Sequence, residues 1–178
     1  MMLSRKISPL PRMGLTILSL LVVGCSLVFP DRTAPKSAIY HITKPEKPWV
    51  AVPTGESTDT TDALKADMAF ENPKTGAILS INSICRKYTK TTLDDLTNNL
   101  VRGIEEKKLI EEKQRILDAT DAKETLFEGV VDKVKIYLRT VVMLKNGCDY
   151  DFMYVTTPQN DAESRVDFEK FITSFKTE

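Results

Sequence analysis

Apolar and polar residues alternate over two neighbouring stretches in the first half of the chain. The alternation over 66–71 has the two-residue period of a half-buried strand, and 77–85 is a second stretch of strand-like composition. The segment between them, 72–76, contains Asn, Pro and Gly and is typical of a turn. We therefore expect a β-hairpin here, preceded by a short strand over 38–43.

A second hairpin is expected in the C-terminal half. Every second residue over 134–144 is apolar or Thr, whereas Lys135 and Arg139 lie on the other face. Asn146-Gly147 follows, a dipeptide that favours two-residue hairpin turns, and 148–156 alternates again on the way back. This is the clearest hairpin signal in the sequence.

Two segments have apolar residues at helical spacing. Thr92-Leu-Asp-Asp95 has the form of a capping box, and behind it recur Leu93, Leu96, Leu100 and Ile104. A second helix is expected to begin at Asp161 or Ser164 as its cap. Its apolar stripe consists of Val166, Phe168, Phe171, Ile172 and Phe175. Both stripes are wide enough to pack on a sheet.

Residues 105–131 fit two interpretations. Glu and Lys pairs over 105–115 would extend the first helix, whereas 109–117 would form a strand. Gly103 and the hairpin downstream favour strands, which are our prediction. The expected fold class is α+β, an antiparallel β-sheet packed by helices as an α/β/α sandwich.

The N-terminus has the pattern of a cleaved signal peptide. Basic residues precede an apolar run over 14–24, as in secretory signals. A membrane-spanning helix needs roughly 20 apolar residues, and the run has about half of them. Val22-Val-Gly-Cys25 resembles the lipobox of bacterial lipoproteins, in which the cysteine is acylated and becomes the mature N-terminus. The alternative is an ordinary signal peptide that ends at a cysteine.

Cleavage before Cys25 would divide the chain into three parts. Residues 1–24 are the signal peptide, 25–37 would be a tether with a reach of about 20 Å, and 38–178 would form a single α+β domain. The signal holds three of the 25 basic residues and none of the 25 acidic ones, so the mature chain has a net charge of about −3. That balance argues against recognition of nucleic acid or anionic lipid by charge.

Acyl chains such as palmitate on Cys25 are therefore expected to hold the domain at a membrane. Each buried methylene contributes about 0.8 kcal/mol, so several chains give nearly permanent anchoring. Lipoproteins kept at the inner membrane often carry Asp after the cysteine, and Ser26 stands there in this chain. In an organism with two membranes, this resemblance favours the outer membrane, facing the periplasm.

Cys85 and Cys148 remain once Cys25 is assigned to lipid. An even number of cysteines in an oxidising compartment indicates a disulfide, and two separate buried thiols are the alternative. Isolated cysteines and one histidine lack the clustered spacing of a zinc site. Asp59 and Asp62 lie in a polar loop without the alternating ligands of a calcium loop. We expect no metal and no cofactor.

Candidate catalytic residues are few. His41, the single histidine, has no evident nucleophile beside it and is interpreted as a partly exposed strand residue. Asp149 and Asp151 come nearest to a glycosidase-like pair, but a solvated strand face opposite Lys135 and Arg139 is the favoured interpretation. No nucleophile elbow or phosphate loop occurs, so we expect no enzyme activity. Four aromatic residues could line a ligand pocket: Trp49, Tyr137, Tyr150 and Tyr154. Their spacing along strands favours a role in the core instead.

Several segments resemble small bacterial lipoproteins with a PsbP/Mog1-like fold. They are Trp49-Val50, Gly76–Ile81 with Cys85, Leu93–Leu100, Cys148–Phe152 and Phe168–Phe175. Such domains are mostly non-catalytic adaptors or assembly factors. The resemblance implies a tethered interaction module that docks on an envelope protein complex, in assembly or transport. A binder of a small hydrophobic ligand or lipid would need a deep apolar pocket, and a hydrolase would need a cleft with convergent acids.

Overall fold

The computed structural model describes residues 38–54, 66–85 and 90–178. The chain divides into two compact units, 1–32 and 33–178, and all described residues belong to the second. The predicted signal peptide, Cys25 and the tether lie outside the described residues, as do Asp59 and Asp62. None of the helices that the structure describes has the length and apolar character needed to cross a membrane.

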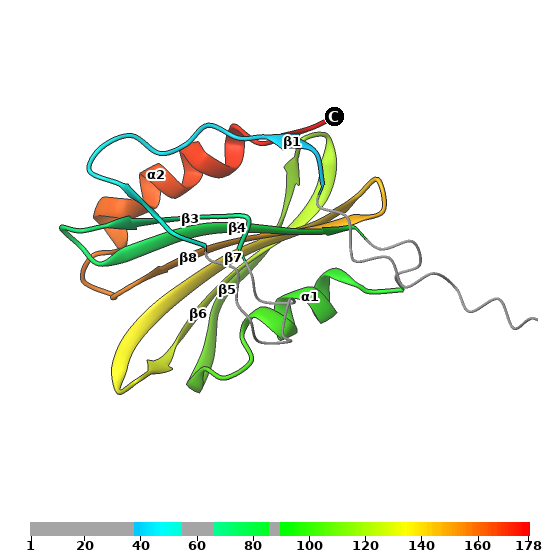
Figure 1. The fold of residues 1–178 in the computed structure, drawn as a ribbon. Coiled ribbons are helices and arrows are strands. Elements are labelled where there is room, and N and C mark those ends of the chain that lie inside the picture. The colour runs from blue at the N-terminus through cyan, green and yellow to red at the C-terminus, as the bar shows by residue number, and fades with distance from the viewer. Residues whose placement is uncertain (1–37, 55–65, 86–89) are drawn as a thin grey trace, which may run out of the picture. The chain divides into compact units, whose positions relative to one another are not determined.

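A seven-stranded antiparallel sheet forms the centre of the described unit (Figure 1). Its strand order is β2-β3-β4-β8-β7-β6-β5. The strands are β2 (Val50–Val52), β3 (Met68–Asn72), β4 (Ala77–Cys85), β5 (Glu105–Leu117), β6 (Thr120–Val131), β7 (Val134–Lys145) and β8 (Cys148–Thr156). Together with two helices, this sheet gives the α+β fold that the sequence predicts.

Tight turns join the four consecutive strands β5 to β8. The turn residues with positive φ are Asp118 (49°), Ala119 (59°), Asp132 (49°), Lys133 (66°), Asn146 (54°) and Gly147 (76°). Positive φ at both turn residues suits the right-handed twist of the flanking strands. Both predicted hairpins are confirmed, and 105–131 forms strands, as the sequence favours.

Helix α2 (Asp161–Thr173) packs on one face of the sheet (Figure 1). The core between them consists of side chains that are at most 2% exposed, among them Leu79, Ile81, Tyr150, Phe152, Tyr154, Phe168, Phe171, Ile172 and Phe175. Two details of the predicted helix are wrong. Its N-cap is Asn160, and Val166 is 56% exposed. Val166 lies two residues before Phe168, which turns it about 200° away from the buried stripe.

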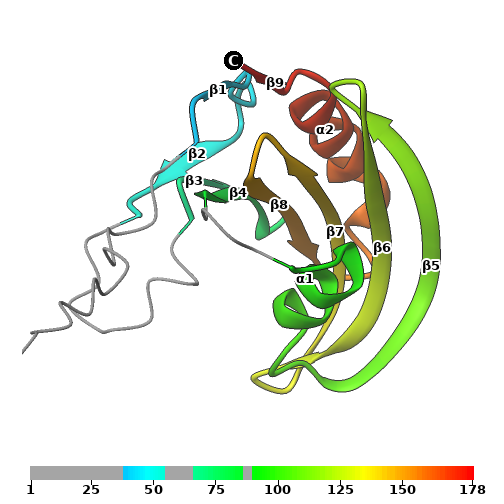
Figure 2. The ribbon, with the colours of Figure 1, turned by 90° about the vertical axis from the view of Figure 1, so that its right-hand side faces the viewer.

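Helix α1 (Leu93–Leu100) packs against β6 and β7 on the opposite face (Figures 1 and 2). The predicted capping box is present: the Asp95 amide donates to Thr92 Oγ1 at 3.1 Å, and the Thr92 amide donates to Asp95 Oδ2 at 3.0 Å. The helix ends before Ile104, because Gly103 takes a φ of 89°. Val101 then packs on Phe127 and Leu138.

The two ends of the described unit meet in a separate two-stranded sheet. Here β1 (Tyr40–His41) pairs antiparallel with β9 (Lys176–Thr177). The predicted strand at 38–43 is thus confirmed in its middle, but its partner β9 was not predicted. Asp118 Oδ2 anchors this end, because it accepts from the Thr177 amide at 3.0 Å and from Lys145 Nζ at 2.6 Å.

Candidate functional site

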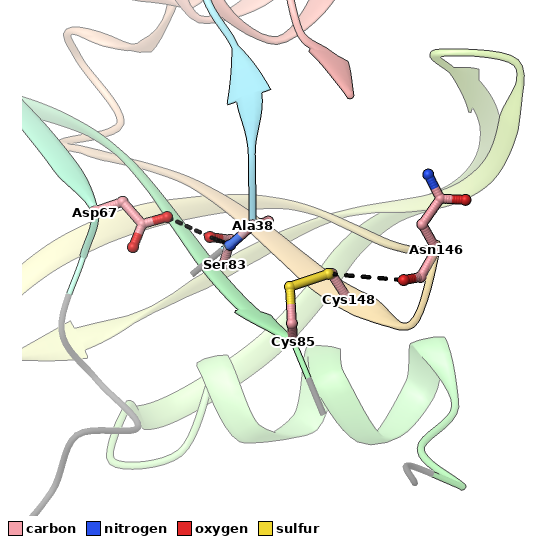
Figure 3. The surroundings of a disulfide bond; sticks show 6 residues. All are labelled: Ala38, Asp67, Ser83, Cys85, Asn146 and Cys148. Atoms are coloured by element: carbon pink, nitrogen blue, oxygen red, sulfur yellow. Dashed lines mark hydrogen bonds between the residues drawn. A yellow bond between two sulfur atoms is a disulfide. The ribbon is translucent and has the colours of Figure 1, made fainter. Parts of the chain in front are cut away.

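A disulfide joins Cys85 and Cys148, as the sequence predicts. The two residues are directly opposite each other in the register of β4 and β8, with Cα atoms 3.9 Å apart. Figure 3 shows the bond beside Ser83, whose hydroxyl donates to Asp67 and accepts from the Ala38 amide. The disulfide therefore fastens the neighbouring strands β4 and β8 close to Ala38, where the described residues begin.

The carboxylate pair Asp149 and Asp151 lies on the α1 side of the sheet and is buried, with 2% and 7% exposure. The predicted solvated face is therefore wrong. In β7 their register partners are Leu144 and Val142, so Arg139 does not lie opposite them. The error has a physical cause, since both faces of β8 are covered. The buried polar side chains around them on β4, β6 and β7 are Ser80, Asn82, Lys123, Thr125 and Thr140.

His41 lies at the exposed β1–β9 pair. Its Nε2 is 2.7 Å from Glu178 Oε1, and both side chains are more than half exposed. This position agrees with the interpretation of His41 as a surface strand residue. Among the described residues, no cluster of three or more His, Cys, Asp or Glu has a geometry that could hold a metal ion.

The aromatic pocket candidates belong to the core. Trp49 is 7% exposed, and its Nε1 donates to Asp167 Oδ2 at 2.9 Å. The Tyr154 ring stacks on Phe168 with centroids 5.5 Å apart, and burial raises the pKa of Tyr154 to about 12. Tyr150 is 2% exposed in the same core, whereas Tyr137 is half-buried. Core packing, rather than a ligand pocket, accounts for the three buried rings.

A buried ion-pair network on the α2 side of the sheet was not predicted. Glu124 Oε1 lies 2.7 Å from Arg139 Nη1, and Glu124 Oε2 lies 2.7 Å from Arg115 Nη1. Lys113 Nζ approaches Glu124 Oε1 at 3.2 Å. Burial raises the pKa of Glu124, but hydrogen bonds from Arg139, Lys113 and Arg115 outweigh it and lower the pKa. Both carboxylate oxygens are engaged in ion pairs, so we assign this network to stability.

A group of exposed apolar residues lies on strands β2 and β4. It was not predicted from the sequence. Val50 is 57% exposed, Val52 is 37% exposed and Ile78 is 42% exposed. Val50 is aligned with Glu71 and Glu71 with Ile78 across β2, β3 and β4, so these side chains share one face, with the exposed Glu71 between the two apolar residues. We call Val50, Val52 and Ile78 the apolar sheet surface.

The apolar sheet surface lies on the same face as α1. Ile78 is aligned with Val155, and Val155 with Leu138, which belongs to the small core under the end of α1. Met153 and Val155 are partly buried against that core. Helix α1 packs on β6 and β7, whereas the apolar sheet surface lies on β2 and β4. Apolar side chains that gather in exposed positions on one face mark a candidate interaction site.

No protein-family model and no curated protein matches the sequence. Solved structures do match the fold. The solution structure of cyanobacterial PsbP (CyanoP) from Synechocystis sp. PCC 6803 is 15% identical, covers 80% of this chain and 93% of its own, and has a TM-score of 0.54. The crystal structure of LpqN, involved in cell envelope biogenesis of Mycobacterium tuberculosis, is 9% identical and has a TM-score of 0.53. The match covers 79% of this chain and 86% of LpqN. At these identities the likeness shows the fold alone, and the fold of this chain is PsbP-like.

Proposed function

We propose that this chain is an envelope lipoprotein that acts as a non-enzymatic interaction module. Its signal peptide directs export, acyl chains on Cys25 anchor it, and the domain docks on an envelope membrane protein complex. The observation that carries the docking role is the apolar sheet surface, which places Val50, Val52 and Ile78 in solvent on one face. The PsbP-like fold and the envelope role of LpqN support the same assignment.

The anchor and the surface have separate tasks in this proposal. A mature net charge of about −3 gives little attraction to anionic lipid, so acyl chains must hold the protein at the membrane. The tether 25–37 reaches about 20 Å from the membrane, which places the domain beside the exposed part of a membrane protein. Burying exposed Val and Ile side chains contributes about 1–2 kcal/mol each to such a contact.

Two variants separate these tasks. Cys25→Ala removes the anchor, and the double variant Val50→Gln, Ile78→Gln removes apolar side chains from the surface. Each protein is crosslinked in living cells of its native host, and captured proteins are identified by mass spectrometry together with the N-terminal mass. We expect acylated wild type to capture a defined envelope complex. Capture should fall by about thirtyfold or more in the surface variant and be lost in Cys25→Ala.

Val166→Gln is the matched control, because Val166 is equally exposed but lies on α2. It should capture the complex as wild type does. Equal capture by the surface variant and wild type would contradict docking through the apolar sheet surface. A wild type without acyl chains, at a location that Cys25→Ala leaves unchanged, would contradict the anchor itself. Recovery of a lipid in place of a protein would assign the surface to lipid binding.

A further inference from the structure

Strand β5 forms the far edge of the sheet from β2 (Figure 2). It is 13 residues long, and within the described part of the chain only β6 pairs with it. Its first ten residues are all exposed, including Leu109 (48%) and Ile110 (44%). A long open edge is a template for pairing with another chain, and charged side chains usually protect such edges. The charges of β5 are unusual in their order, Glu-Glu-Lys-Lys-Leu-Ile-Glu-Glu-Lys over 105–113.

The pairing of β5 with β6 shifts register twice, between Glu105 and Lys108 and between Leu109 and Glu111, and the bulge at the second shift decides which of these charges share a face. Lys108 is aligned with Glu128 and Glu111 with Leu126, with a register shift between Leu109 and Glu111. Residues 126 and 128 are two apart in β6 and share a face, so Lys108 and Glu111 do as well. In a regular strand, residues three apart would point to opposite faces. The bulge therefore places these opposite charges on the same side of the sheet.

The other face of β5 carries a second pair of opposite charges. Leu109 is aligned with Phe127 and Glu112 with Thr125, so both lie on the face of Phe127. Lys107 lies on that face too, since its Nζ is 6.0 Å from the centre of the Phe127 ring. Each face of β5 thus presents one Lys before the bulge and one Glu after it.

We propose that β5 pairs antiparallel with β5 of a second copy of this chain, about a two-fold axis between Leu109 and Ile110. In this register Lys107 lies opposite Glu112 of the second copy, and Lys108 lies opposite its Glu111. The symmetry repeats both pairs, so four cross-strand pairs of opposite charge surround a centre of Leu and Ile. Because of the bulge, each Lys and the Glu opposite it point to the same side of the sheet. Opposite-charge pairs across strands are stabilising, and like charges directly opposite are destabilising.

The two nearest registers lack this complementarity, because an axis at Leu109 places Glu106 opposite Glu112 and an axis at Ile110 places Lys107 opposite Lys113. An axis at Glu111, Glu112 or Lys113 places that residue opposite its own copy, which pairs like charges. An axis at Gln114 places Lys113 opposite Arg115. Glu111 and Glu112 contact Lys113 and Lys123 of their own chain, but their side chains are 44% and 45% exposed and remain accessible to a second copy. An axis between Glu106 and Lys107 also places each Lys opposite a Glu, but it pairs only residues 105–108 of β5, whereas the proposed axis pairs residues 105–114. Charge and the length of the paired strand together therefore favour the proposed pairing. It uses the opposite edge of the sheet from the apolar sheet surface, so it does not depend on the proposed docking role.

The test uses two differently tagged copies of the full chain, expressed in the same cells and extracted in neutral detergent. Recovery of one tag with the other measures self-association. Lys107→Glu with Lys108→Glu makes all four pairs repulsive, and we expect recovery to fall by about tenfold or more. The control Lys74→Glu with Lys90→Glu has the same change of net charge at exposed positions away from β5 and should keep wild-type recovery.

A charge swap between the copies checks the register itself. A copy with Glu111→Lys and Glu112→Lys should fail to pair with itself but should pair with the Lys107→Glu, Lys108→Glu copy, because all four contacts are again of opposite charge. Circular dichroism and thermal unfolding establish that both variants are folded. A wild type whose tags do not co-purify would overturn the proposal. So would undiminished recovery with Lys107→Glu and Lys108→Glu, or two folded swapped copies that fail to associate.

Discussion

Replacing both Cys85 and Cys148 with alanine should lower the free energy of unfolding by about 4 kcal/mol. The two cysteines are 63 residues apart in the sequence and close a loop that contains α1 and strands β5 to β7. In the unfolded chain this closure removes conformational entropy, which the variant regains. Urea unfolding of the oxidised protein and of the variant, followed by circular dichroism, measures the difference. The midpoint should fall while the helix and sheet signals of the folded state persist.

Reduced wild type is the control for this measurement. Its unfolding midpoint should match that of the Cys85→Ala, Cys148→Ala variant, and a reducing agent should leave the variant unchanged. A difference below about 1 kcal/mol between oxidised and reduced protein would contradict the estimate. It would indicate that β4 and β8 remain close in the unfolded ensemble without the bond.

Local signals in the sequence were sufficient for several elements. Asn146-Gly147 accommodates positive φ at both turn positions, so the β7–β8 hairpin could be predicted from two residues and the alternation around them. The Thr92 and Asp95 capping box likewise marks the first residue of α1. The disulfide followed from an even count of the cysteines left after Cys25, together with the predicted signal peptide. In each case the information lies within a few residues or in the composition.

Strands β5 and β6 were harder to predict, because the sequence signals for the strands and for the turns that follow them are weak or misleading. Its two turns use Asp118-Ala119 and Asp132-Lys133, which adopt positive φ without glycine. The Glu and Lys residues over 105–115 also occur at spacings that stabilise helices. Hairpin pairing of β6 with β7, which itself pairs with β8, makes this segment part of the sheet.

The candidate sites depended on which faces the helices cover. Asp149 and Asp151 alternate with aromatic residues, as in a strand with one solvent-exposed face, yet both faces of β8 are buried. Conversely, Val50 and Ile78 lie on the same face of the sheet as α1, but α1 covers β6 and β7 and leaves them exposed. Strand alternation tells which residues share a face, but the position of α1 on β6 and β7 comes from tertiary packing.

Glu124→Gln should lower the free energy of unfolding by about 3 kcal/mol or more. The Glu124 side chain is 1% exposed and neutralises Arg139, Arg115 and Lys113. When residue 124 is uncharged, Arg139 stays buried, and the ion pair left to it is the weaker contact to Glu111 at 3.5 Å. Arg139→Met should cost less, because Arg115 and Lys113 still pair with Glu124. Urea unfolding at neutral pH measures both variants.

The pH dependence of stability distinguishes the lost charge from a general packing defect. Because the pKa of Glu124 is lowered from 4.5, its contribution is complete above that value and is lost as the pH falls toward the folded-state pKa. The difference between wild type and Glu124→Gln should therefore shrink below about pH 4. A difference that stays constant down to acid pH would assign the effect to packing. Glu128→Gln in the same strand is the matched control. Its partner Lys135 is 59% exposed, so the variant should change stability by at most about 1 kcal/mol.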